Sequence, residues 1–107
     1  MKIVITAAGN QLSAAFDKRF GRGAWFCVYD DKSGQAEFIQ NPGKDANNGA
    51  GTKAAEKMVA MSVDKVISGD FGPKAKDMLE KFNVQMVILQ DDGLTVQNII
   101  DRMKSNS

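Results

Sequence analysis

The chain has 107 residues with 43% hydrophobic content, which suits one domain with a sizeable core and is too little for two. Lys and Arg number 14 against 13 Asp and Glu, so the formal charge of +1 predicts no general attraction to nucleic acid or to an anionic membrane. Histidine is absent and Cys27 is the single cysteine, which excludes the commonest general base, an intrachain disulfide and a thiolate cage for a metal.

Short apolar or β-branched runs predict strands over residues 2–8, 24–30, 35–40, 64–67 and 85–89. The second and third strands flank a turn at residues 31–34 and should form a hairpin. Apolar positions at helical spacing predict helices over residues 52–62 and 73–82. A third helix is carried by Val96, Ile99, Ile100 and Met103, and residues 105–107 read as a frayed tail.

This order of elements begins with antiparallel neighbours and ends with crossovers, which are right-handed and join parallel strands. A single α/β domain over residues 1–107 satisfies it, with a five-stranded mixed sheet in the order 3-2-1-4-5, the second strand antiparallel and helices on both faces. That is a ribonuclease H-like fold. Four loops then meet at one edge of the sheet, where open sheets bind ligands. They comprise residues 9–10, 19–23, 41–52 and 68–73.

The loop before the first helix contains Asn48, Gly49, Ala50, Gly51 and Thr52. Glycines let backbone N–H groups turn toward a ligand, and the helix that follows leaves its first amides unbonded at the positive end of its dipole. These features are typical of an anion site. An ordinary flexible loop with a helix cap is the alternative interpretation, because short glycine motifs are weak signals.

Three further loops carry candidate ligand contacts. Arg19, Phe20, Gly21 and Arg22 place two guanidinium groups three residues apart, and such groups donate to oxo or sulfido groups. The alternative is a solvated pair of arginines around a packed Phe20. The other contacts are Asn10 after the first strand and, after the fourth, Gly69, Phe71 and Gly72.

Other chemistry is disfavoured. Residues 49–54 fit G-x-G-x-x-A, but irregular residues separate them from the preceding strand, and no Walker-type GK[ST] follows. A two-metal nuclease needs carboxylates on its strands, and the first strand has none. Cys27 lies among apolar residues and should be an inert core residue.

Four segments in order resemble the dinitrogenase iron-molybdenum cofactor biosynthesis family. They are Arg19-Phe20-Gly21-Arg22, Asn41-Pro42, Gly49-Ala50-Gly51, and the stretch from Val63 through Gly72-Pro73-Lys74-Ala75. The resemblance covers residues 2–89 and implies the same fold, no catalytic activity and non-covalent handling of an anionic metal-sulfur cluster. Small stand-alone relatives look like carriers of a molybdenum-copper sulfide cluster, and others belong to iron-molybdenum cofactor assembly. Many relatives have a histidine where this chain has Asn48, which favours hydrogen bonding over coordination here.

We therefore expect a cytoplasmic, non-enzymatic carrier of a molybdenum-containing sulfide cluster. It should be a monomer or weak homodimer that has protein partners but binds neither nucleic acid nor membrane. A nucleotide or phospho-metabolite sensor that uses the same edge is the alternative. A third possibility is a module that serves only as a contact surface in a larger complex.

Overall fold

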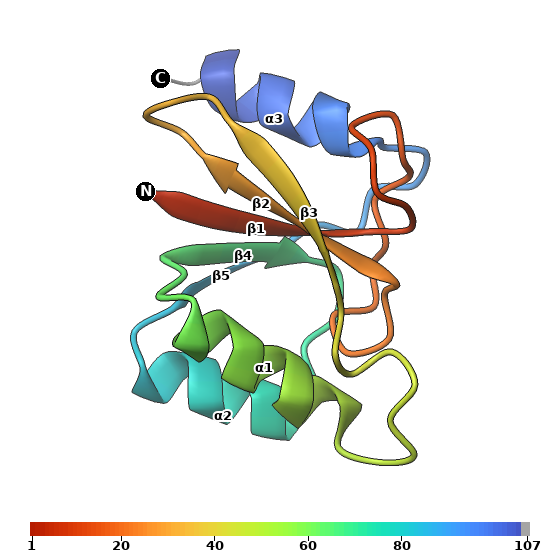
Figure 1. Ribbon diagram of the computed structural model, residues 1–107, viewed down its shortest axis with the longest axis vertical. Coiled ribbons are helices and arrows are strands. Elements are labelled where there is room, and N and C mark those ends of the chain that lie inside the picture. Colours follow the sequence, from red (N-terminus) through yellow and green to blue (C-terminus); the bar gives the residue numbers. More distant parts are fainter. Residues whose placement is uncertain (106–107) are drawn as a thin grey trace.

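The computed structural model describes residues 1–105 and has an α/β architecture (Figure 1). Its strands are β1 (Lys2–Ala7), β2 (Trp25–Asp30), β3 (Ala36–Gln40), β4 (Lys65–Ser68) and β5 (Gln85–Ile88). Its helices are α1 (Ala50–Ala60), α2 (Pro73–Lys81) and α3 (Val96–Ser105). The frayed-tail prediction is wrong for Ser105, which ends α3, and its other two residues lie outside the described chain.

The strands form one sheet in the order β3-β2-β1-β4-β5. β2 runs antiparallel to both of its neighbours, whereas β1, β4 and β5 pair in parallel. The predicted mixed sheet of order 3-2-1-4-5 is thus confirmed. α1 and α2 cover one face of the sheet and α3 covers the other (Figure 1). The carboxyl ends of β1, β3, β4 and β5 consequently share one edge, which we call the loop edge.

The strand β1 is buried from Ile3 to Ala7, so both faces of the sheet are covered. Val4 belongs to the core beneath α1 and α2, which includes Phe20, Phe26, Met58 and Leu79. Ile3 and Ile5 belong to the core beneath α3. Cys27 and the predicted apolar positions Val96, Ile99 and Ile100 are buried in that second core. Alternate residues of one strand therefore hold the two helical layers together.

The start of α1 differs from the prediction. The helix begins at Ala50 and not at Thr52, because Gly49 has a positive φ of 70° and turns the chain directly into the helix. Ala50 is 8% exposed and is packed as part of the first turn. Two residues that were predicted to precede the helix are thus helical, and their amides point along the helix axis.

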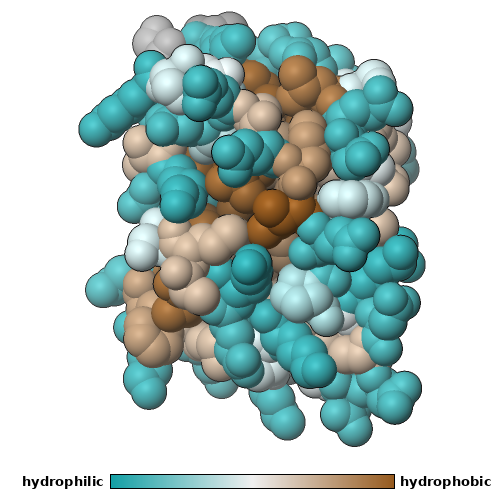
Figure 2. Space-filling view, viewed as in Figure 1, coloured by the Kyte–Doolittle hydropathy of each residue, from teal (hydrophilic) through white to brown (hydrophobic). Residues whose placement is uncertain are grey.

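Polar residues dominate the loop edge in the space-filling view, at the right of Figure 2. Apolar side chains gather in the middle of the same view, over the strands. The edge strand β3 contributes to that region, with Phe38 and Ile39 only half-buried. Within residues 1–105 no helix combines the length and the hydropathy needed to cross a membrane.

Candidate functional site at the loop edge

The space between the carboxyl ends of β1 and β4 is filled by the chain itself. Chain order changes direction between these strands, and open α/β sheets usually bind ligands in that crevice. Here Asp17 N–H donates to Thr6 O at 3.0 Å, and Gly69 N–H donates to Lys18 O at 3.1 Å. Phe20 N–H then donates to the carbonyl of Asp70 at 3.3 Å. Residues 17–20 therefore bridge the two strand ends, and a ligand must bind outside them.

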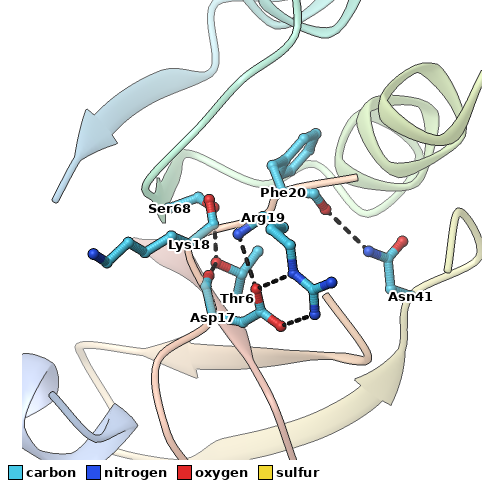
Figure 3. Close-up of polar contacts among 7 residues, drawn as sticks. All are labelled: Thr6, Asp17, Lys18, Arg19, Phe20, Asn41 and Ser68. Atoms are coloured by element: carbon cyan, nitrogen blue, oxygen red, sulfur yellow. Dashed lines mark hydrogen bonds and ion pairs between the residues drawn. The ribbon is translucent and has the colours of Figure 1, made fainter. Parts of the chain in front are cut away.

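Two buried hydroxyls fix this segment to the sheet (Figure 3). Thr6 and Ser68 are both fully buried, and their hydroxyl oxygens lie 2.8 Å apart. The Thr6 hydroxyl also contacts the carbonyl of Asp17, and the Ser68 hydroxyl contacts that of Lys18 at 3.4 Å. Burying a polar group is costly unless it is hydrogen-bonded, so these contacts tie residues 17 and 18 to the sheet.

The guanidinium of Arg19 pairs with Asp17 (Figure 3). Arg19 Nη2 lies 3.0 Å from Asp17 Oδ2, and its Nε donates to Oδ1 at 3.1 Å. Partial burial alone would raise the pKa of Asp17, but the hydrogen bonds and charge of Arg19 outweigh it and lower the pKa below its usual range. Arg19 remains 67% exposed in its side chain, so it still faces solvent while part of its charge is neutralised.

Arg22 extends to the loop that precedes α1, residues 41–49, which we call the glycine loop. Its Nη1 donates to the carbonyls of Lys44 and Ala46, at 3.3 and 2.5 Å. Asn41 is buried at the start of that loop, where its amide donates to Phe20 O at 3.0 Å and its Oδ1 accepts from Gly43 N–H at 2.9 Å. The glycine loop is therefore bonded directly to residues 19–23, the arginine loop.

Glycines allow this close approach. A Cβ on Gly43 would lie 2.3 Å from Ala50 O, and a Cβ on Gly21 would lie 2.8 Å from Gly51 N. Such distances are well inside van der Waals contact, so backbone from the arginine loop, the glycine loop and α1 meets without intervening side chains.

The amino-terminal turns of α1 and α2 also meet at this edge. A Cβ on Gly51 would lie 3.4 Å from Ala75 Cβ, which is ordinary contact between the first turns of the two helices. Neither N-cap, Gly49 or Gly72, makes a side-chain hydrogen bond, and neither first turn contains an acidic residue. The first helical hydrogen bonds reach back from Lys53 to Gly49 and from Lys76 to Gly72. The amides before these have no partner within their helices and lie at the positive ends of two dipoles.

The predicted site residues do not all present side chains there. Phe20 is 1% exposed, and its ring packs against Phe26 and Phe71 with centroids 5.9 and 5.0 Å away. Phe20 and the buried Ala50 therefore support the edge and can offer a ligand only backbone. Asn48, Gly49 and Gly72 are exposed, while Gly69 is buried against Lys18 and Leu89.

Asn10 lies toward α3. Its loop receives hydrogen bonds from the start of that helix, from Val96 N–H to Ala14 O at 3.0 Å and from Gln97 N–H to Leu12 O at 2.9 Å. Figure 1 draws this loop near α3 and the glycine loop near α1, on opposite faces of the sheet. The structure thus brings the arginine loop, the glycine loop and residues 69–72 together, with Asn10 apart from them.

A further loop at this edge was not among the predicted site segments. Residues 89–94 follow β5, where Gln90 donates to Gly69 O and Lys18 pairs with Asp92. The sheet order predicts that this loop lies at the loop edge, because β5 is parallel to β4 and must end at the same edge. The pairing with Lys18 lowers the pKa of Asp92, so this side of the edge carries a neutralised cation.

The described chain offers few ligands for a soft metal ion. Cys27 is fully buried in the sheet, and burial raises the pKa of its thiol to about 11. Within residues 1–105 no group of three or more Cys, His, Asp or Glu side chains is arranged to hold a metal ion. The chemistry available at the loop edge is therefore backbone N–H and guanidinium donation, suited to an anion.

The sequence profile of the dinitrogenase iron-molybdenum cofactor family matches residues 1–106. The chain belongs to this family. A curated protein of Methanocaldococcus jannaschii is 28% identical over 89 residues, which are 80% of this chain and 72% of the relative.

Solved structures agree with this membership in the dinitrogenase iron-molybdenum cofactor family. The apo form of the orange protein from Desulfovibrio gigas superposes with a TM-score of 0.88 and 31% identity, covering 98% of this chain and 88% of that chain. A NifB-like protein from Thermotoga superposes with a TM-score of 0.81 and 31% identity, covering 97% and 87%. The chain is therefore a small protein related to cofactor proteins of this family.

Proposed function

We propose that this protein binds and carries, without transforming it, an anionic metal-sulfur cluster that contains molybdenum. The cluster would be of the molybdenum-copper or iron-molybdenum type and would be held non-covalently at the loop edge. The proposal includes a cytoplasmic location and the ribonuclease H-like assignment of the fold, which the sheet order supports.

The observation that carries the proposal is the contact between two uncapped helix N-termini. The first turns of α1 and α2 meet at Gly51 and Ala75, and neither turn contains a carboxylate. Each N-terminus carries roughly half a positive charge, so two in contact attract an anion more than either alone. Arg22 lies on the adjoining loop and adds a positive charge, and Arg19 adds the part of its charge that Asp17 does not neutralise.

The residues present fit such a cargo by hydrogen bonding and charge. Sulfido and oxo groups accept hydrogen bonds from amides and guanidinium groups, which are the donors that this edge supplies. The residues of the loop edge do not fit a cluster that requires protein thiolates or imidazoles, because Cys27 is buried and histidine is absent. The cluster would therefore arrive preformed, and its affinity would decrease with ionic strength.

A nucleotide sensor is less well supported. Nucleotides in open α/β folds bind in the crevice where chain order reverses, and residues 17–20 fill that space here. A phosphate group alone would still find two helix N-termini, so binding of inorganic phosphate must be measured beside binding of the cluster.

The test is reconstitution of the apo protein with tetrathiomolybdate and Cu(I), followed by gel filtration, a visible spectrum and metal analysis. We expect molybdenum and a charge-transfer absorption to co-elute with the protein. Calorimetry with ATP should give no saturable heat, and calorimetry with inorganic phosphate shows whether the two helix N-termini bind a simple anion as well. A colourless, metal-free protein peak would reject the proposal, and saturable ATP binding would favour the sensor.

A matched pair of variants locates the site. Thr52→Asp puts a carboxylate in the first turn of α1, where it should lower cluster retention at least about tenfold while leaving the helix intact or stabilised. Ser33→Asp makes the same charge change in the hairpin turn at the opposite edge and should retain the cluster like the parent. Equal retention by both variants would place the cluster elsewhere.

A further inference from the structure

The side chain of Arg22 is directed at its own chain. One guanidinium nitrogen donates to two carbonyls of the glycine loop, those of Lys44 and Ala46. Two carbonyls two residues apart converge on one cation only when the loop curves around it. We infer that Arg22 is a positioning residue, a latch that holds the glycine loop so that the first amides of α1 face the loop edge. The inference rests on the proposed function, since it concerns the same site.

The rest of the glycine loop explains why a latch is needed. Its beginning is fixed by buried Asn41 and by local turns, in which Lys44 N–H donates to Asn41 O and Ala46 N–H to Gly43 O, both at 3.1 Å. Beyond Ala46, within residues 1–105, no hydrogen bond joins Asn47 or Asn48 to another segment. The chain then turns at Gly49 into α1. Arg22 is thus the last tie between the two loops before the helix begins.

The neighbouring arginine differs in its contacts. Arg19 is bonded to Asp17 within its own segment and makes no contact with the glycine loop among the interactions of the described chain. Both arginines are exposed and carry the same charge. Arg19→Ala removes the same charge from the loop edge as Arg22→Ala does, but it leaves the bonds between Arg22 and the glycine loop in place. Arg19→Ala is therefore the control for Arg22→Ala.

The latch can be measured in the apo protein with trypsin. Lys44 is a cleavage site whose own carbonyl is bonded to Arg22, and a bonded carbonyl must be released before a protease can use it. Lys32, in the exposed hairpin turn, serves as the internal standard. The readout is the ratio of cleavage after Lys44 to cleavage after Lys32, determined by mass spectrometry of the fragments.

We expect Arg22→Ala to raise this ratio by about tenfold or more, because two hydrogen bonds from a charged donor are lost. Arg22→Lys should recover part of the protection, since an ammonium can donate to both carbonyls. Arg19→Ala should leave the ratio unchanged. Unchanged ratios in both Arg22 variants would overturn the latch.

Cluster retention by the same variants separates this inference from the proposed function. If Arg22→Ala loses tetrathiomolybdate but keeps the parent's cleavage ratio, Arg22 contacts the cluster directly and the latch is rejected. If the parent itself retains no cluster, the proposed function fails, while the cleavage ratios still decide whether Arg22 holds the loop.

Discussion

The hydroxyl oxygens of Thr6 and Ser68 lie 2.8 Å apart at the carboxyl ends of β1 and β4, with both residues fully buried. Thr6 also bonds the carbonyl of Asp17, so the pair joins the sheet to residues 17–20. We expect Thr6→Val, which preserves shape, to lower the free energy of unfolding by about 1–3 kcal/mol because a buried acceptor loses its donor. Urea denaturation measures this change. Ser13→Ala, at an exposed position, should stay within about 0.5 kcal/mol of the parent, and equal midpoints for all three proteins would contradict the prediction.

Gly43 is packed against backbone on two sides. A Cβ there would lie 2.3 Å from Ala50 O and 2.8 Å from Gly21 O. Gly43→Ala should therefore displace the start of α1 and cost about 1–3 kcal/mol of unfolding free energy, as overpacking usually does. Gly72→Ala is the matched control, because nothing lies within 4 Å of a Cβ at Gly72, where φ is −62°. Its cost should be about 1 kcal/mol or less, and thermal unfolding of both variants tests the difference.

Cys27 should be inert in the folded protein. Burial raises the pKa of its thiol to about 11, so at pH 8 it should not react with an aromatic disulfide reagent until the protein unfolds in urea. The unfolded thiol has a pKa near 8.5, so above that pH the unfolded state releases a proton that the folded state keeps. The contribution of Cys27 to stability is thus present below about pH 8.5 and is lost as pH rises toward 11. Cys27→Ala should lack that alkaline decrease, and rapid labelling of the folded parent would contradict the prediction.

Acid should weaken the fold through Asp17. Arg19 lowers the pKa of this carboxyl in the folded protein against the opposing effect of partial burial. The resulting stabilisation is present above the unfolded pKa of about 3.9 and is lost as pH falls through the lower folded value. We expect Asp17→Asn to lower the urea midpoint at pH 7 and to differ less from the parent at pH 3. Asp45→Asn, an exposed carboxylate on the glycine loop, makes the same charge change and serves as the control. A gap between parent and Asp17→Asn that is as large at pH 3 as at pH 7 would contradict this account.

The fold could be predicted because its signals are local and repeated. The buried run of β1 and the apolar spacing of α2 define their elements, and the rule on crossovers then leaves few orders for the sheet. The boundary at Ala50 was missed because a left-handed glycine can start a helix at once or continue a loop, and the residue type does not distinguish the two.

The site was predicted as a set of loops but not in its contacts. Arg22 bonds to backbone carbonyls, and every residue has a carbonyl, so no sequence pattern marks that pairing. Likewise, the pair of Arg19 and Asp17 depends on the path of residues 17–20, which is set by Thr6 and Ser68 far away along the chain. The sequence identifies the cationic residues of a site, whereas tertiary packing decides which of them are already bonded to other groups of the protein.

The filling of the crevice by residues 17–20 bears on selectivity. A pocket between two strands has a width that the sheet's hydrogen bonds set, so it selects ligands by diameter. A surface made by loops has no such limit, because it lies outside the hydrogen-bonded strands. Discrimination among metal-sulfur clusters at this edge should therefore depend little on their diameter, and clusters with different numbers of metal atoms should compete for it on similar terms.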